Sequence, residues 1–205
     1  MAVLGDNLSG FVLAGGQSTR MGRDKAALTL DGRTLLETAL TVLRRVAHKV
    51  FILGSPELYR AYGTVIADIF PGCGPLGGIH AALSRTTSPF NLIIAVDTPF
   101  LSAEFLAYLA GRAADSSAMV TIPEIRGYLE PACAVYKREF LPIAEQALRR
   151  GDNKITPLLP KDVGATLVIP EAELTQFAFT AEMFENLNTP EDLERARRRS
   201  PGRSA

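Results

Sequence analysis

Short apolar segments alternate with amphipathic segments along most of the chain, and this alternation limits the folds that it can adopt. The short, mostly apolar runs at residues 8–13, 50–53 and 91–96 are typical of strands buried on both faces. Residues 34–47 instead repeat leucines at helical spacing behind Thr34, which is suited to be the N-cap. Strands that alternate with helices predict a mostly parallel α/β sheet with helices on both faces, and so three layers.

The remaining expected strands and helices continue this alternation. Further strands are expected at residues 64–69, 118–122, 133–136 and 165–169. Further helices are expected at residues 56–62 behind a proline at N1, at 79–84, at 103–114 with Ser102 as N-cap, at 138–150 ended by Gly151, and at 189–199 with Thr189 as N-cap.

Composition excludes several classes of protein. A chain of 205 residues with 47% hydrophobic and 21% charged residues suits one globular domain. The formal net charge of zero argues against bulk electrostatic binding to nucleic acid or to an acidic membrane. Cys73 and Cys133 form no CxxC pair, so we expect reduced thiols and a cytoplasmic protein. The first ten residues show no basic n-region, and the sequence has no run of 18 apolar residues, so we expect neither secretion nor a membrane span.

The stretch LAGGQSTRMGRDKA concentrates glycine and positive charge directly after the first expected strand. Glycines let backbone N–H groups approach an anion, and the side chains of Arg20 and Lys25 can neutralise its charge. The spacing fits neither the P-loop nor the dinucleotide fingerprint. The stretch therefore predicts a different cradle for a polyphosphate, although a basic surface loop is the alternative.

Two carboxylates are expected at the edge of the sheet where ligands bind in such folds. Asp97 ends the strand at 91–96, where a carboxylate suits Mg²⁺; the alternative is a capping or turn aspartate before Thr98-Pro99. Asp68 lies near the end of the strand at 64–69, either in a nucleotide pocket or as a turn residue. His48 and His80 lie on helical segments and are expected to be surface or satisfied residues rather than ligands.

Five blocks of sequence, in order, resemble the nucleotidyltransferases typified by molybdenum cofactor guanylyltransferases. The blocks are LAGGQSTRMGRDKA, GRTLLETAL, GPLGGIHAAL, VDTPFLS and FENLNTPEDLERA, and they span nearly the whole chain. The first block is shared by many sugar and cofactor nucleotidyltransferases, whereas the ordered set is much more specific. The resemblance implies one nucleotidyltransferase domain with a three-layer α/β/α, Rossmann-like fold over residues 1–199, followed by a frayed basic tail at 200–205.

The resemblance also implies a reaction: GMP moves from GTP to the terminal phosphate of molybdopterin, the guanine dinucleotide cofactor forms, and pyrophosphate leaves. The acceptor phosphate is already an anionic nucleophile, so positioning and electrostatics must supply the rate. The implied catalytic residues are Lys25, Arg20 and Asp97, with Asp97 as the Mg²⁺ ligand. The implied nucleotide-binding residues are Leu13, Ala14, Gly15, Gly16, Gly22, Lys25, Asp68 and Asp97, and the implied acceptor-binding residues are Gly77 and Gly78, in an expected loop at 74–78, with Asn186 and Asn188. The two asparagine amides could instead complete the metal shell, or serve only turn and capping chemistry before Thr189-Pro190.

The resemblance favours guanine as the base, because the adjacent Gly15 and Gly16 give this chain LAGG, whereas the family's cytosine-using members usually show LAAG.

This chain departs from the family pattern in two places, near the ends of the strands expected at 50–53 and 91–96. Near the end of the strand at 50–53, members often carry an asparagine that helps to hold the base. This chain has Leu53-Gly54-Ser55 there, and Ser55 is the candidate replacement. The common CDMPF block here reads VDTPF, which retains Asp97.

Three alternative functions remain open at this stage. The chain could be a cytidylyltransferase for the same acceptor, a sugar-phosphate nucleotidyltransferase, or a non-catalytic nucleotide-binding carrier of the cofactor. Lys25 and Asp97 argue against the carrier, because binding alone has little need for a magnesium carboxylate. The expected partners are GTP and molybdopterin, with molybdoenzyme apoproteins or cofactor-insertion proteins as candidate recipients, and with no nucleic acid and no membrane.

Overall fold

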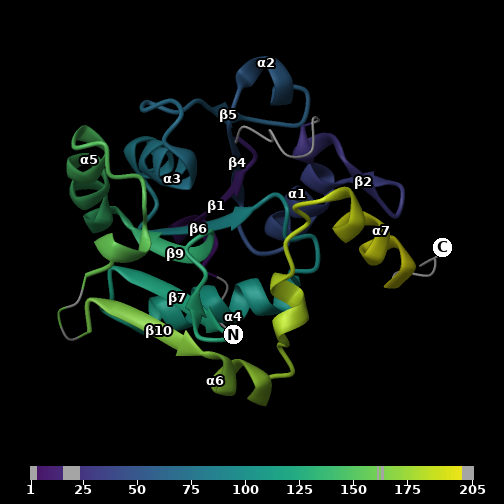
Figure 1. The fold of residues 1–205 in the computed structure, drawn as a ribbon. Helices are drawn as coiled ribbons and strands as arrows, with labels where there is room; N and C mark the ends of the chain where they lie inside the picture. The colour runs from purple at the N-terminus through teal and green to yellow at the C-terminus, as the bar shows by residue number, and fades with distance from the viewer. Residues whose placement is uncertain (1–3, 16–23, 161, 163, 200–205) are drawn as a thin grey trace.

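A mixed, mostly parallel sheet forms the centre of the computed structural model, which describes residues 4–15, 24–160, 162 and 164–199. The sheet has the strand order β10-β7-β9-β6-β1-β4-β5, with β8 paired to β7 (Figure 1). Its strands are β1 (Leu8–Leu13), β4 (Lys49–Leu53), β5 (Val65–Ile66), β6 (Phe90–Ala95), β7 (Val120–Ile125), β8 (Tyr128–Leu129), β9 (Cys133–Lys137) and β10 (Thr166–Pro170). Along the main path only β9 runs antiparallel to its neighbours β6 and β7.

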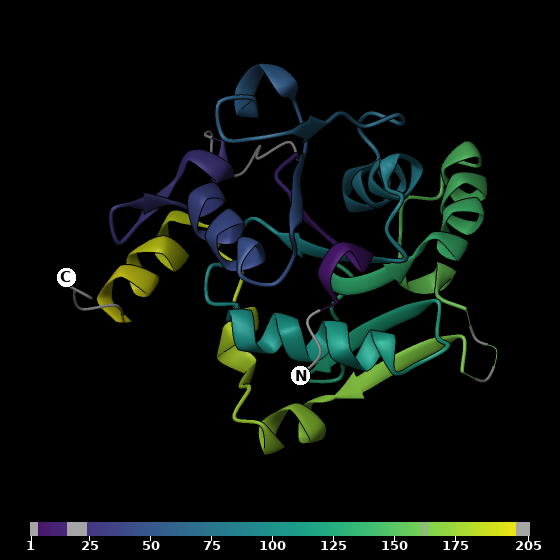
Figure 2. The same ribbon diagram turned by 180° about the vertical axis from the view of Figure 1, so that it is seen from behind.

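Helices cover both faces of this sheet, which confirms the three-layer α/β/α prediction. The helices are α1 (Leu35–Arg44), α2 (Pro56–Tyr59), α3 (Gly74–Arg85), α4 (Ala103–Ala114), α5 (Leu141–Arg149), α6 (Glu171–Gln176) and α7 (Pro190–Arg199). Helices α3 and α5 lie together on one face, and α1 and α4 lie on the other (Figures 1 and 2). Among the described residues, no helix combines the length and the apolar character needed to cross a membrane.

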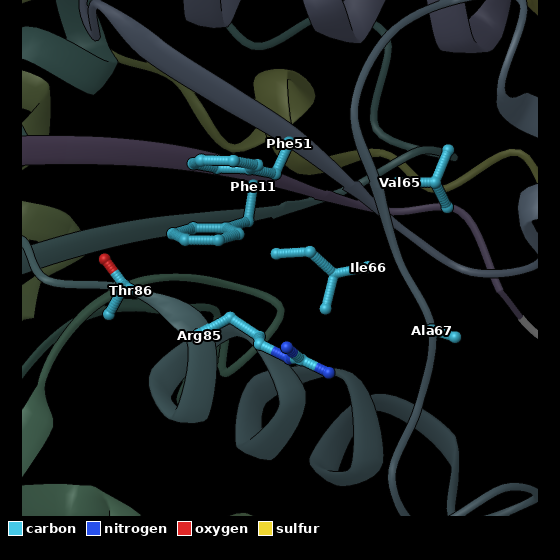
Figure 3. Close-up of a pocket in the computed structure, with 7 residues that line it drawn as sticks. All are labelled: Phe11, Phe51, Val65, Ile66, Ala67, Arg85 and Thr86. Atoms are coloured by element: carbon cyan, nitrogen blue, oxygen red, sulfur yellow. The ribbon is translucent and has the colours of Figure 1, made fainter.

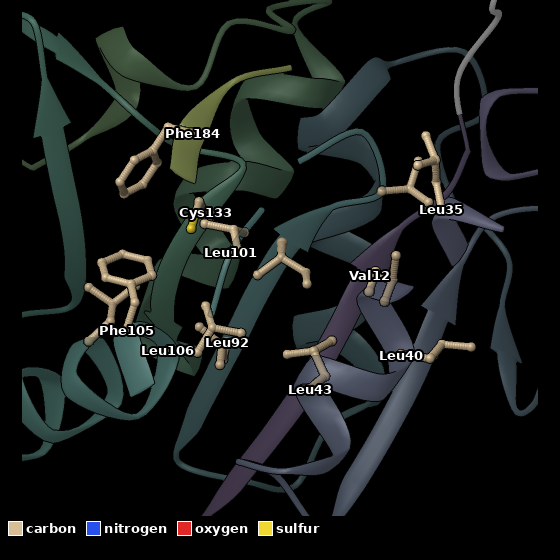
Figure 4. Close-up of a cluster of buried hydrophobic side chains, with 14 of the residues drawn as sticks. Val12, Leu35, Leu40, Leu43, Leu92, Leu101, Phe105, Leu106, Cys133 and Phe184 are labelled. Atoms are coloured by element: carbon tan, nitrogen blue, oxygen red, sulfur yellow. The ribbon is translucent and has the colours of Figure 1, made fainter. Parts of the chain in front are cut away.

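The alternation of side chains along β1 divides the core into two clusters. Val12 lies next to Leu40 and Leu43 of α1 in the cluster on this face, which extends to Phe105 of α4 on its far side (Figure 4). Its neighbours Phe11 and Leu13 point to the other face and pack against α3. Because every residue of β1 is buried, the strand is uniformly apolar except for Ser9 and Gly10, as expected for a central parallel strand.

Several helix starts agree with the caps expected from the sequence. Thr34 caps α1 in a capping box with Glu37, and the hydroxyl of Ser102 accepts the N–H of Phe105 at the start of α4. Thr189 Oγ1 accepts the N–H of Asp192 at 3.1 Å in the first turn of α7. These caps satisfy N–H groups that lack a partner within the helix, so short polar sequences determine where the helices begin.

The glycine-rich segment 74–78 was expected to be a loop before a helix at 79–84, and this expectation is wrong. Helix α3 begins at Gly74, with Pro75 in its first turn, so all five residues are helical. The prediction missed that Gly77 and Gly78 permit close packing of this helix. A Cβ on Gly77 would lie 2.9 Å from the carbonyl oxygen of Phe70, and one on Gly78 would lie 2.5 Å from Leu13 Cδ2.

Other boundaries also differ from the expectations. The strand expected at 64–69 pairs only over Val65–Ile66, because the chain leaves the sheet before Asp68. The segment 138–150 is a 3₁₀ turn followed by α5, and α2 ends at Tyr59. The sequence analysis missed α6, β8 and the hairpin of β2 (Thr29–Leu30) and β3 (Arg33–Thr34). An Asp31-Gly32 turn with φ of 51° and 77° joins this hairpin, and such a dipeptide is a known hairpin signal.

Candidate active site

The ammonium group of Lys25 lies between two oxygen atoms from distant parts of the chain. Its Nζ is 2.7 Å from Asp97 Oδ2 and 2.6 Å from Asn188 Oδ1. The side chains of Lys25 and Asp97 are only 20% and 17% exposed, so solvent screens this ion pair less than a surface pair. The fold therefore brings together three residues that the sequence analysis assigned to separate blocks.

Different elements hold each member of this cluster. Lys25 opens the 3₁₀ turn η2 (Lys25–Ala27), in which Asp24 Oδ1 accepts the N–H of Ala26. Asp97 lies two residues beyond β6, at the edge where the parallel strands end, and the N–H of Val96 donates to the carbonyl of Leu13 at 3.1 Å. The site thus lies at the carboxyl edge of the sheet, as the general rule for such folds predicts.

The segment before α7 attaches Asn188 directly to Asp97. The N–H of Leu187 donates to the carbonyl of Asp97 at 2.9 Å, and the N–H of Asn188 donates to Asp192 Oδ2 at 3.0 Å. Leu187 is buried while Asn186 and Asn188 are exposed, which agrees with the alternation of an extended segment. The amide of Asn188 faces Lys25, whereas that of Asn186 has no partner among the described residues, and its contact with an acceptor stays a prediction.

Of the two alternative interpretations of Asp97, the helix cap is wrong, whereas the residue does lie in the turn that follows β6. Helix α4 starts six residues later and is capped by Ser102, so Asp97 is not its N-cap. The following turn is instead closed by Thr98, whose hydroxyl donates to the carbonyl of Ala95 at 2.9 Å. The Asp97 carboxylate is left to bind the ammonium of Lys25.

The end of β1 leads to the site but is anchored to the neighbouring strand. The N–H groups of Ala14 and Gly15 both donate to the carbonyl of Leu53, at 3.0 and 2.9 Å. Leu13 and Ala14 are buried, and Gly15 is exposed. Gly16, Arg20 and Gly22 lie outside the described residues, so their expected roles stay predictions.

Asp68 lies beside the first turn of α3, near the two glycines expected to contact the acceptor. Its Oδ2 would be 3.7 Å from a Cβ on Gly77, and burial raises the pKa of its carboxyl. Gly77 and Gly78 are themselves buried, and their missing side chains serve packing against Phe70 and Leu13. A role in acceptor binding is not needed to explain either glycine.

Two further side chains differ from what the sequence suggested. Ser55, the candidate replacement for the family's asparagine, places its hydroxyl 2.5 Å from Glu57 Oε2, within its own helix start. His80 is only 3% exposed, and its Nδ1 has no partner within the described residues. Its ring meets the edge of Phe70, and burial lowers the pKa of the imidazole. His80 is thus a neutral core residue of α3 rather than a surface or satisfied one.

A magnesium ion would find oxygen ligands here. Among the described residues there is no group of three or more His, Cys, Asp or Glu side chains that could hold a metal. The oxygen atoms of Asp97 and Asn188 nevertheless converge on a cation, the ammonium of Lys25. Mg²⁺ is typically held by one or two carboxylates together with substrate phosphates, so this donor set fits the ion.

Two hollows lie elsewhere on the surface. One, of about 350 Å³, is lined by the stacked rings of Phe11 and Phe51, by β5 and by Arg85 and Thr86 at the end of α3 (Figure 3). None of its lining residues belongs to the predicted site. The other, of about 550 Å³, lies between the segment 24–29 and α7. Its lining includes Asp24, the residue before Lys25.

Sequence reasoning missed two residues that support the site, Tyr59 and Asp24. Tyr59 is 4% exposed, and its hydroxyl lies 2.9 Å from Asp24 Oδ1 and 3.1 Å from the carbonyl oxygen of Ala14. Asp24 precedes Lys25 in the quoted block, which was the available signal. Nothing in the local sequence of α2 indicated that Tyr59 reaches this block.

Known proteins resemble this chain over nearly its whole length. The family model for the MobA-like NTP transferase domain matches residues 10–165. A probable molybdenum cofactor guanylyltransferase of Carboxydothermus hydrogenoformans is 34% identical over 190 residues, which cover 92% of this chain and 94% of that protein. A molybdenum cofactor guanylyltransferase of Desulfosudis oleivorans is 35% identical over 194 residues, which cover 93% and 95%.

Solved structures share the fold. The crystal structure of molybdopterin-guanine dinucleotide biosynthesis protein A from Archaeoglobus fulgidus has a TM-score of 0.81 and 28% identity, and covers 93% of this chain and 97% of that one. A 2-C-methyl-D-erythritol 4-phosphate cytidylyltransferase from Thermus thermophilus has a TM-score of 0.68 at 17% identity, covers 94% and 98%, and supports the fold alone.

Proposed function

This chain belongs to the MobA-like NTP transferase family and is a nucleotidyltransferase of the molybdenum cofactor guanylyltransferase type, and on that premise we propose its substrates and the roles of its residues. We propose that it transfers GMP from GTP to the terminal phosphate of molybdopterin and releases pyrophosphate. The observation that carries the proposal is the position of Lys25 Nζ, within 2.7 Å of both Asp97 and Asn188 at the carboxyl edge of the sheet.

In the proposed reaction an oxygen of the acceptor phosphate forms a bond to the α-phosphorus of GTP while the bond to the bridging oxygen of pyrophosphate breaks. Both reactants are anions, so the chain must hold them together and stabilise the charge that collects on the leaving group. Lys25 supplies positive charge for this purpose. Its contacts with Asp97 and Asn188 hold the ammonium in place before substrate binds, which lowers the reorganisation needed during the reaction.

Asp97 is the proposed magnesium ligand, because its carboxylate lies just beyond the end of a central strand and caps no helix. When bound there, Mg²⁺ would neutralise charge on the triphosphate and on the departing pyrophosphate. Asn188 would orient Lys25 through its amide oxygen. Arg20, Gly16 and Gly22 are proposed to complete the triphosphate site from the same block of sequence.

Asp68 is proposed to face the guanine base. Its carboxylate lies beyond β5 and beside α3, and it makes no hydrogen bond to the other described residues. A carboxylate is an acceptor for the N–H groups that guanine presents, whereas cytosine presents fewer.

We also propose a cytoplasmic enzyme. Cys73 and Cys133 are both free thiols, which supports this proposal.

A nucleotide panel tests the proposal. Pyrophosphate release is measured with GTP, CTP, ATP and UTP, each with molybdenum-loaded molybdopterin as acceptor and with a sugar phosphate as the alternative acceptor. We expect release with GTP and molybdopterin. Release with CTP alone would refute the guanine assignment, release onto the sugar phosphate alone would refute the acceptor, and tight GTP binding with no turnover would indicate a carrier.

A further inference from the structure

One buried hydroxyl connects the two described ends of the glycine-rich block. Three acceptor oxygens surround the hydroxyl of Tyr59: the carbonyl oxygen of Ala14 at 3.1 Å and the Asp24 carboxylate oxygens at 2.9 and 3.0 Å. Ala14 follows β1 directly, and Asp24 directly precedes Lys25. Tyr59 belongs to α2, which lies over the ends of β4 and β5 (Figure 1).

The surrounding packing fixes the position of this hydroxyl. Tyr59 is 4% exposed, and a Cβ on Gly54 would lie 2.9 Å from its ring carbon Cε2. The ring therefore occupies space that only a glycine after β4 leaves open. Gly54 stands beside the carbonyl of Leu53 that anchors Ala14 and Gly15. The tyrosine ring, the end of β4 and the end of β1 thus form one packed unit.

The chemistry of the contact makes it a stable link. A phenol hydroxyl has one proton, and a carboxylate is a stronger acceptor than a neutral carbonyl. Burial and the neighbouring Asp24 carboxylate both raise the pKa of Tyr59, so the hydroxyl stays protonated and able to donate at physiological pH. Asp24 also accepts the N–H of Ala26, so a single carboxylate joins Tyr59 to the turn that carries Lys25.

We propose that Tyr59 is a positioning residue for nucleotidyl transfer: by holding Asp24 against the end of β1, its hydroxyl sets the position of Lys25 relative to Asp97. The inference rests on the proposed function for its kinetic consequence, because it is Lys25 that acts on the triphosphate. Without the hydroxyl, Asp24 keeps its bond to Ala26 but loses its link to α2. The turn that carries Lys25 then keeps its internal hydrogen bonds but is no longer tied to the end of β1, so the contacts with Asp97 and Asn188 must fix its position relative to the sheet.

The kinetic test compares Tyr59→Phe with a matched control, Tyr62→Phe. Tyr62 lies three residues further along, and its hydroxyl has no hydrogen bond to another described residue. Because this hydroxyl donates to a charged carboxylate that supports the turn carrying Lys25, we expect kcat/KM for GTP to fall about tenfold or more in Tyr59→Phe. We expect the control to keep wild-type kcat/KM. Wild-type kcat/KM in Tyr59→Phe would overturn the inference.

A second pair of variants shows whether Tyr59 acts through Asp24. Asp24→Asn retains an acceptor oxygen for both Tyr59 and Ala26, whereas Asp24→Ala removes both contacts. We therefore expect Asp24→Asn to retain more activity than Asp24→Ala. We also expect Tyr59→Phe to lower kcat/KM far less in the Asp24→Ala background than in wild type. An equal loss in both backgrounds would show that Tyr59 does not act through Asp24 and would overturn the inference.

A measurement without substrate separates this inference from the proposed function. Peptide-resolved hydrogen–deuterium exchange is followed over residues 24–34 in wild type, Tyr59→Phe and Tyr62→Phe. We expect faster amide exchange in Tyr59→Phe only, because the turn carrying Lys25 has lost a support. Unchanged exchange would overturn the inference even for an active enzyme. A wild type without GTP turnover would instead refute the proposed function, and the exchange result would still decide the role of Tyr59.

Discussion

The buried glycine at position 77 offers a quantitative test of the packing around α3. In Gly77→Ala, the new Cβ would lie 2.9 Å from the carbonyl oxygen of Phe70 and 3.4 Å from Cys73 Cβ. Carbon–oxygen contacts usually lie at about 3.3 Å or beyond, so the Phe70 carbonyl must move by about 0.4 Å or more. This oxygen belongs to the backbone, so rotation of a side chain cannot relieve the contact.

Two opposing effects determine the net change in stability. Overpacking a well-packed site costs about 1–3 kcal/mol. Replacing glycine by alanine inside a helix contributes about 0.5–1 kcal/mol in the other direction. Gly111 in α4 provides the matched control, because a Cβ there would meet nothing within 4 Å. Since both variants gain the same helix propensity, the difference between them isolates the steric cost.

We expect Gly77→Ala to be less stable than Gly111→Ala by about 1–3 kcal/mol. For a protein of this size the corresponding difference in Tm is about 2–12 °C. Urea unfolding and thermal melts followed by circular dichroism measure both quantities. Equal stabilities of the two variants would refute the conclusion that close packing against Phe70 requires a glycine.

Three other predictions concern the ion pair, a buried histidine and a helix cap. Lys25→Met and Asp97→Asn should each lower turnover by about 10²–10³, the scale for losing one preorganised electrostatic group, and full activity in either folded variant would contradict that residue's role. Burial holds the pKa of His80 below its usual 6.5, outweighing the opposite effect of the Glu145 carboxylate, so the unfolded chain binds this proton first as pH falls. The free energy of unfolding should therefore decline as pH falls below about 6.5, and urea unfolding at several pH values should show a flatter profile for His80→Gln; identical slopes would be the contrary result. Thr34→Ala removes the capping box of α1 and should cost about 0.5–2 kcal/mol by urea unfolding, more than Thr41→Ala within the same helix; an equal cost would argue against the cap.

Local patterns in the sequence were sufficient to predict the layers of the fold and the starts of several helices. Apolar runs such as Leu8–Leu13 can be satisfied only by burial on both faces, and Thr34 and Ser102 cap their helices through neighbouring residues. Lys25 and Asp97 were also candidates on local features, a basic glycine-rich block and a strand end, and their roles stay predictions. These properties depend on residues close together in the chain.

Contacts between distant segments were decided only by the tertiary structure. Asn188 was assigned to the acceptor, yet its amide lies on Lys25, because Leu187 pairs with the backbone of Asp97. The glycines at 77 and 78 were interpreted as a ligand loop, but they are helical because α3 packs closely on Phe70 and Leu13. Tyr59 reaches Ala14 and Asp24 across 45 and 35 residues of sequence, respectively. Local periodicity carries no information on which side chain will fill a space in another element, so such links arise only from packing.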